Sequence, residues 1–180
     1  MRRVAPLVLL LLTPLTFFSC GKQPPVDPVP VSAADPTRHR AQDDMELARI
    51  AENARNTLPF FFRRIQRRRA GDGNFRIKYP LRADPRSGFS REQVWLSNIR
   101  FQNGRYSGVL NNTPYYIPGL SRGDSISIDM EEITDWMFTR KGKIMGGRSI
   151  KFLLEQIPEH ERDEEQRRIL EMFSPPYPPA

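Results

Sequence analysis

The sequence predicts an α+β fold: a curved antiparallel sheet of about five to seven short strands, with a long N-terminal helix packed on it and a helical C-terminal extension. Three observations carry this prediction. Apolar residues recur with a helical period over residues 42–69, and the period changes to that of a strand after the turn at Ala70-Gly71-Asp72-Gly73. The strand-like runs that follow are separated by Gly, Pro and Asn residues, which favour turns.

Residues 42–69 are expected to form one amphipathic helix. Because its apolar stripe stays in phase across Pro59, we expect a single helix that is kinked at this residue. At 3.6 residues per turn, the stripe is about 120° wide. It consists of Leu47, Ile50, Ala51, Ala54, Leu58, Phe61, Phe62 and Ile65.

Beyond this helix, short segments alternate apolar and polar residues, which is the pattern of half-buried strands. Asn103-Gly104 and Lys141-Gly142 mark two tight hairpins, and Pro80 places the end of the first strand at a sheet edge or a bulge. The predicted strands cover residues 75–81, 94–101, 105–110, 115–117, 125–128, 136–140 and 143–145.

Three further helical segments are expected. Asp129, with Glu132 three residues later, forms a capping pattern for a short turn over residues 130–134. Gly146-Gly147 opens a helix over residues 148–156. A last, heavily charged helix over residues 158–173 offers only a small docking patch, made of Ile169, Leu170 and Phe173.

The N-terminus resembles a bacterial lipoprotein signal. Arg2 and Arg3 precede an apolar run, and Ser19 is the small residue expected before a lipid-modified cysteine, Cys20. Bulky Phe17 and Phe18 stand where smaller residues are usual, so an ordinary cleaved signal or an uncleaved anchor stays open as an alternative. Two or more acyl chains on Cys20 would hold the protein firmly on a membrane.

The expected organisation therefore has five parts. Residues 1–19 are the signal peptide, residues 20–41 a lipidated Pro-rich linker, and residues 42–157 the α+β domain. Residues 158–173 form the charged helix, and residues 174–180 a disordered Pro-rich tail. The expected location is the cell envelope, on the periplasmic side of the outer membrane if the host is Gram-negative, since Gly21 rather than Asp follows Cys20.

The composition excludes several kinds of site and partner. Cys20 is the only cysteine in the 180 residues, so lipidation would leave no thiol for a disulfide, a thiolate nucleophile or a zinc site. The formal net charge is +7, which favours anionic neighbours such as phospholipid headgroups. Nucleic acid is not expected as a partner of an exported protein. The expected partners are the membrane, through the lipid, and another envelope protein or an anionic surface component.

Arginines gather near the end of the long helix, on the side opposite its apolar stripe. They are Arg63, Arg64, Arg67 and Arg68. One interpretation is a solvated helix end, where positive charge complements the helix dipole by about 0.3–1 kcal/mol per group. The other is a contact with an anionic membrane or surface polymer.

A second candidate binding site combines Asp135 and Trp136 with Gly146, Gly147 and Arg148. Two glycines before a helix allow backbone amides to approach an anion at the positive end of the dipole, and Arg148 would add a charge-assisted bond. The alternative is structural: the glycines form a tight turn, Trp136 fills the core and Asp135 caps a helix N-terminus.

The sequence leaves catalysis uncertain but favours a protein that is not an enzyme. His39 and His160, the only histidines, fall in the predicted linker and the last helix, away from the sheet. The nearby carboxylates match no calcium loop, so we expect no metal and no cofactor. Those considered are Asp124, Asp129, Glu131, Glu132 and Asp135.

Several short motifs, in this order, resemble domain-of-unknown-function family 2314, the YegJ-like bacterial proteins. They are Val94-Trp95-Leu96, Gly108-Val109-Leu110-Asn111-Asn112 with Pro114, Gly123-Asp124, Ile133-Thr134-Asp135-Trp136-Met137 and Gly146-Gly147-Arg148-Ser149-Ile150. The resemblance covers residues 45–154 and departs at an extra Tyr115-Tyr116 pair and in the Arg-rich helix end. It implies the same fold and no settled activity, with relatives that accompany interbacterial toxin and immunity systems.

The functional hypothesis is a lipid-anchored bacterial envelope protein with a non-catalytic binding domain. Two alternatives remain. One is an envelope hydrolase that uses the acidic residues, and the other is an immunity-type protein that binds a toxin.

Overall fold

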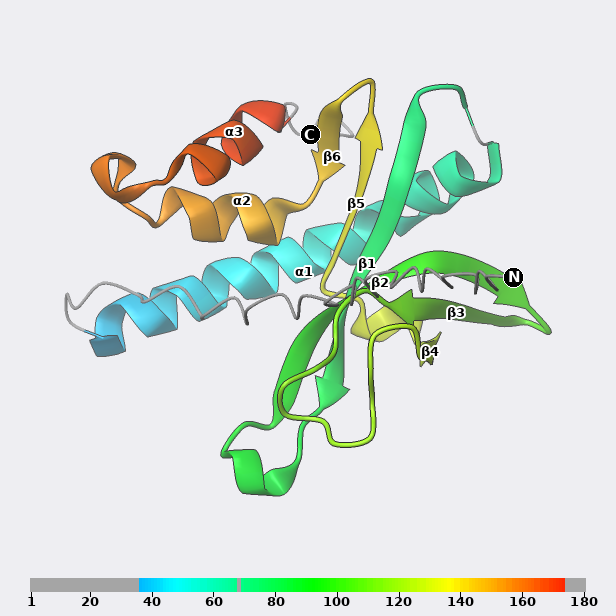
Figure 1. The fold of residues 1–180 in the computed structure, drawn as a ribbon, viewed down its shortest axis with the longest axis horizontal. Coiled ribbons are helices and arrows are strands. Elements are labelled where there is room, and N and C mark those ends of the chain that lie inside the picture. Colours follow the sequence, from blue (N-terminus) through cyan, green and yellow to red (C-terminus); the bar gives the residue numbers. More distant parts are fainter. Residues whose placement is uncertain (1–35, 68, 174–180) are drawn as a thin grey trace, which may run out of the picture. The chain divides into compact units, whose positions relative to one another are not determined.

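A long helix and a six-stranded antiparallel sheet form most of the fold (Figure 1). The structure is a computed structural model, and it describes residues 36–67 and 69–173, which lie in one compact unit. Helix α1 covers Pro36–Arg67. The strands are β1 Asp72–Arg82, β2 Arg91–Gln102, β3 Arg105–Leu110, β4 Ser125–Ile128, β5 Asp135–Arg140 and β6 Lys143–Gly146. Cys20 and the predicted signal, linker and tail lie largely or wholly outside the described residues.

The strands follow the order β4-β3-β2-β1-β5-β6, and all neighbouring pairs are antiparallel. Helices α2 (Arg148–Glu155) and α3 (Glu164–Met172) follow β6. Short 3-10 turns complete the set: η1 Pro85–Ser87, η2 Met130–Glu132 and η3 Glu159–Glu161. The predicted α+β class, with the long helix packed on a sheet, is confirmed.

The apolar stripe of α1 packs on the sheet as its periodicity predicts. Leu58 and Phe61 are 3% and 0% exposed, and the ring of Phe61 lies 5.3 Å from that of Trp136 on β5. Core residues of β1 and β2, such as Ile77 and Leu96, are paired across the sheet and share this buried face. Pro59 lies exposed within α1, and the helix continues through it.

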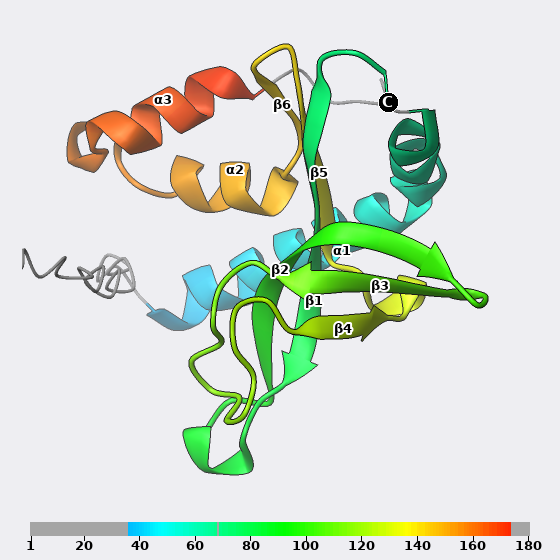
Figure 2. The same cartoon turned by 45° about the vertical axis from the view of Figure 1, so that its right-hand side comes forward.

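The central strands β1 and β2 diverge after a short shared stretch. They pair from Arg82↔Arg91 to Ile77↔Leu96, beyond which β1 pairs only with β5 and β2 only with β3. A β-bulge interrupts each strand just past this point, and the bulges contain Asn74 and Asn98, whose φ angles are 51° and 49°. Figures 1 and 2 show the two groups of strands running apart, and we call this opening the fork.

Pro80 lies where β1 is paired on one side only. The pairing of β1 with β5 ends at Lys78↔Asp135, while Pro80 is opposite Gln93 of β2. A proline lacks the N–H that a fully paired strand needs, so this local edge accommodates it. The expectation that Pro80 marks an edge is confirmed.

Three predicted elements differ in the structure. Residues 115–117 form no strand, because the N–H groups of Tyr115 and Tyr116 donate to the Glu92 carboxylate instead of to a neighbouring strand. The predicted helix 158–173 is two elements, η3 and α3, because Asp163 begins a new helix with a capping box to Gln166. Helix α1 begins six residues before the predicted start, at a proline that suits the first turn of a helix.

Candidate functional site

The predicted constellation around Asp135 is brought together, but it forms a junction between β5 and α2. Asp135 is 2% exposed, and its Oδ2 accepts bonds from the Ser149 amide at 2.8 Å and the Ser149 hydroxyl at 2.7 Å. Its Oδ1 accepts a bond from the Trp136 amide at 2.8 Å. The N-cap residue Gly147 has no side chain to cap α2, so Asp135 supplies the negative charge that a helix N-terminus favours.

Lys78, which sequence reasoning did not single out, completes this cluster. It lies opposite Asp135 on β1, and its Nζ donates to the Ser149 hydroxyl at 3.1 Å. Burial lowers the pKa of the Lys78 ammonium, which the charge of Asp135 opposes. Burial likewise raises the pKa of the Asp135 carboxyl, against the hydrogen bonds from Ser149 and Trp136 and the charge of Lys78. We call Lys78, Asp135 and Ser149 the junction cluster.

Gly146 and Gly147 serve the tight turn from β6 into α2. Both have positive φ angles, 76° and 66°. A Cβ on Gly146 would lie 2.2 Å from the Trp136 carbonyl oxygen and 2.6 Å from its ring, so only glycine fits there. Phe173, which follows α3, would lie 3.1 Å from a Cβ on Gly147, so this residue of the predicted apolar patch lies beside the turn.

Trp136 joins the same region to α1. It is 3% exposed, and its indole N–H donates to the Thr57 hydroxyl at 2.9 Å and to the Ala54 carbonyl at 3.2 Å. The anion position that the glycine pattern suggested at the start of α2 is therefore filled by Asp135 itself. Of the five predicted residues, Arg148 and Gly146 are partly exposed, and binding of an external ligand by this constellation stays a prediction.

The four predicted arginines do not share one surface. Arg63 and Arg67 are exposed, whereas Arg64 is 6% exposed and forms an ion pair with the buried Asp72 carboxylate. Its guanidinium also lies 5.9 Å from the centre of the Phe138 ring. The expected exposed position is thus wrong for Arg64, because α1 turns it toward the first residue of β1. Arg68 lies outside the described residues.

Most of the acidic residues considered for metal or acid–base chemistry have local structural partners. Asp129 caps η2 through the Glu131 amide, and Asp124 accepts a bond from the Ser121 amide at 2.8 Å. Glu132 pairs with Arg91 at 3.0 Å. Within the described ranges, no three Asp, Glu, His or Cys residues are grouped as metal ligands. The side chain of His160 is largely exposed, 3.5 Å from Glu161.

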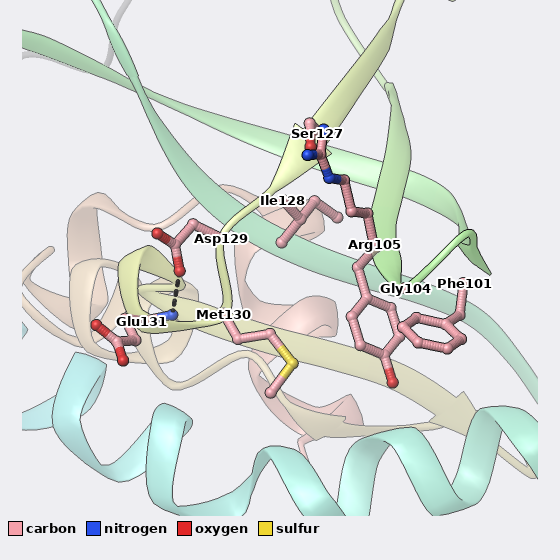
Figure 3. A pocket seen from close by; sticks show the side chains of 9 residues that line it. Phe101, Gly104, Arg105, Ser127, Ile128, Asp129, Met130 and Glu131 are labelled. Carbon is pink, nitrogen blue, oxygen red and sulfur yellow. Dashed lines mark hydrogen bonds between the residues drawn. The ribbon is translucent and has the colours of Figure 1, made fainter.

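A hollow of about 670 Å³ lies between the β2–β3 hairpin and η2, and we call it the hairpin hollow (Figure 3). Phe101 and Met130 stand on opposite sides of it and are 60% and 41% exposed. The Phe101 ring lies 4.7 Å from that of Tyr106, which in turn lies 4.3 Å from Phe62 of α1. The last turns of α1 therefore lie beside this hairpin.

A second hollow, of about 540 Å³, lies in the fork, and we call it the fork hollow. Both diverging strands line it, through residues 72–76 of β1 and 97–99 of β2, together with Ile65 of α1 and Asn111. No motif pointed to this place, because its lining residues are scattered over four segments. The paired positive-φ asparagines at the bulges become informative only once the strands are placed side by side.

Among the residues that the structure describes, no helix is long and apolar enough to cross a membrane.

Comparison with known proteins identifies relatives without assigning an activity. Residues 43–169 match the family described as "Uncharacterized protein conserved in bacteria (DUF2314)". The chain is 30% identical over 128 residues to the uncharacterized protein YegJ of Escherichia coli K12, covering 71% of this chain and 80% of YegJ.

It is also 34% identical over 127 residues to the Neisseria meningitidis serogroup B protein NMB1133/NMB1171, whose name mentions an ankyrin repeat. This match covers 68% of this chain, which spans only about half (50%) of that relative's length. No solved structure matches the chain significantly.

Proposed function

The chain belongs to the DUF2314 family of bacterial proteins, and we propose that this member is a lipid-anchored envelope protein whose folded domain binds an anionic envelope surface rather than catalysing a reaction. The observation that carries this proposal is the β2–β3 hairpin. Its exposed side chains include the Phe101 ring and two arginines, Arg100 and Arg105.

A hairpin that exposes both an aromatic ring and arginines suits the boundary between lipid headgroups and acyl chains. Burying the apolar surface of the ring stabilises the bound state. Each cationic side chain near an anionic surface contributes about 1 kcal/mol to binding. Met130 adds a second exposed apolar side chain across the hairpin hollow. Arg63 and Arg67 extend the positive charge on the neighbouring end of α1.

The lipid is the second part of the proposal and depends on the sequence around Cys20, which lies outside the described residues. A diacylated and N-acylated cysteine would keep the domain close to a membrane. Weak surface contacts of the hairpin would then act at a high effective concentration. The proposed location is the cell envelope, at the outer membrane in a Gram-negative host.

Metabolic labelling with a palmitate analogue, followed by cell fractionation, tests the anchor. We expect label and membrane location in the wild type, and loss of the label in Cys20→Ser. An unlabelled wild-type protein would contradict the lipid anchor.

Vesicle flotation of the Cys20→Ser chain tests the surface contact separately. We expect binding to vesicles that contain phosphatidylglycerol, little binding to pure phosphatidylcholine, and a decrease with added salt. Arg63→Gln with Arg67→Gln, or Phe101→Ala with Arg105→Gln, should each weaken binding severalfold.

The matched control is Arg122→Gln with Arg168→Gln, which removes two exposed arginines elsewhere on the chain. An equal loss in this control would show that only net charge matters and would reject the hairpin surface. Vesicle binding that does not depend on the charge of the lipid would also reject the hairpin surface.

A further inference from the structure

The fork hollow contains polar side chains that the fold itself does not use. Within residues 36–67 and 69–173, the side chains of Arg76, Asn98 and Asn111 make no hydrogen bond or ion pair. Asn98 is exposed, and Arg76 and Asn111 are half-buried. Two amides and a guanidinium in one hollow supply donors and acceptors that no described residue occupies.

The charge that the hollow offers to a ligand is positive. Asp72 also lines it, but the Asp72 side chain is fully buried and is neutralised by Arg64, with Arg140 at 4.0 Å. Arg76 is therefore the unpaired charge of the lining. A guanidinium prefers carboxylate and phosphate oxygens, which it binds through two parallel hydrogen bonds.

The remaining lining residues suit a compact ring. Ile65, Phe75 and Ile99 supply an apolar wall, and the Ser97 hydroxyl adds a polar group opposite Val109. The volume of about 540 Å³ lies within the usual range of roughly 300–1,000 Å³ for small-molecule sites. A sugar has this combination of an apolar ring face and a rim of hydroxyl groups.

We propose that the fork hollow binds an anionic sugar unit, with Arg76 on its carboxylate or phosphate and the amides of Asn98 and Asn111 on its hydroxyl groups. The bulges at Asn74 and Asn98 keep β1 and β2 apart and so maintain the opening. This site is distinct from the hairpin hollow and does not depend on lipidation. Its test is therefore separate from that of the surface contact.

Calorimetric titration of the full chain in detergent tests the proposal with four probes: glucuronic acid, glucose 6-phosphate, glucose and inorganic phosphate. We expect either or both anionic sugars to bind at least about tenfold more tightly than glucose and than phosphate alone. Preference for one of the two identifies the anion as a carboxylate or a phosphate.

Arg76→Gln should remove the preference for the anionic sugar, and Arg76→Lys should restore part of it. Asn111→Ala should weaken binding of the sugar without changing that preference. The matched controls are Arg82→Gln, an exposed arginine farther along β1, and Asn112→Ala, the exposed neighbour of Asn111, and both should bind as the wild type does. Thermal unfolding of each variant checks that it is folded.

Three results would overturn the proposal. They are no binding of any probe at about 10 mM, equal affinity for phosphate and glucose 6-phosphate with no gain for glucuronic acid, and binding that Arg76→Gln leaves unchanged. A preference for an extended peptide over all four probes would also replace the sugar as the ligand.

Discussion

Arg76 and Lys78 stand two residues apart on β1, yet their surroundings differ completely. Lys78 belongs to the junction cluster, where its Nζ, the Ser149 hydroxyl and the Asp135 carboxylate are joined by hydrogen bonds. Arg76 lines the fork hollow, where its guanidinium has no bonded partner within the described part of the chain.

The difference separates polar groups that hold the fold from polar groups that are available to a ligand. A buried polar network stabilises when every member is paired, and an external ligand would have to break those pairs. Unpaired polar groups at an open surface need only exchange bound water for the ligand. Four predictions test whether the junction cluster, the glycine turn beside it and the Arg64–Asp72 pair are structural in this sense.

Gly146→Ala should have the largest effect, because a Cβ would lie 2.2 Å from the Trp136 carbonyl oxygen and the backbone has a positive φ. We expect the free energy of unfolding in urea to fall by about 4 kcal/mol or more. Gly142→Ala is the control, since it has a similar φ of 79° but nothing within 4 Å. It should cost about 1 kcal/mol, and equal losses would mean that backbone strain alone explains both.

Arg64→Ala should destabilise the protein by about 3 kcal/mol, because it leaves the buried Asp72 carboxylate with Arg140 alone at 4.0 Å. The adjacent exposed Arg63→Ala should change stability by less than about 0.5 kcal/mol. Chemical denaturation of both variants measures the difference. Similar values for the two would contradict the burial of Arg64.

Asp135→Asn should cost about 2 kcal/mol in urea unfolding, because it leaves Lys78 without its counter-charge and replaces an acceptor of the α2 amide. The control is Asp163→Asn at the start of α3, where asparagine caps as well as aspartate and stability should hardly change. If a turnover is found that folded Asp135→Asn has lost, the junction cluster is catalytic instead.

The smallest expected effect is a pH dependence of stability. Burial raises the pKa of Asp135 in the native state above the ordinary value of 3.8. Between pH 3.8 and this raised pKa, the native state therefore holds a proton that the unfolded chain has released. The wild type should therefore gain stability relative to Asp135→Asn as the pH falls through the raised pKa, and the gain should be complete below 3.8. Parallel pH profiles of the two proteins would contradict the raised pKa.

Local patterns predicted much of the fold correctly. The Asn103-Gly104 turn located the β2–β3 hairpin, and the bounds of β3 and β4 match the structure. The apolar stripe of α1 is buried as expected. These features depend on neighbours in sequence, namely turn residues and hydrophobic period. The start of α3 was also readable, since Asp163 and Gln166 form a capping box, but the charged segment was interpreted as one helix.

The candidate site was less predictable. Asp135, Trp136 and the two glycines lie together as grouped, because Gly-Gly before a helix is a local signal, whereas ligand binding there stays a prediction. The partners Lys78 and Ser149 were missed, since an alternating lysine in a strand looks solvent-exposed until the strand pairing is known. Arg64 was misplaced for a similar reason, because its partner Asp72 begins a strand that only the tertiary fold brings against α1.

By itself, the sequence determined the α+β class, the long helix and most strands, because local propensity and hydrophobic period encode them. The lipid anchor at Cys20 remains a prediction from sequence. Only the tertiary structure decided which charges are paired and which are free. It places Lys78 against Asp135 through the register of β1 and β5. It also opens the fork around Arg76, where the pairing of β1 and β2 ends.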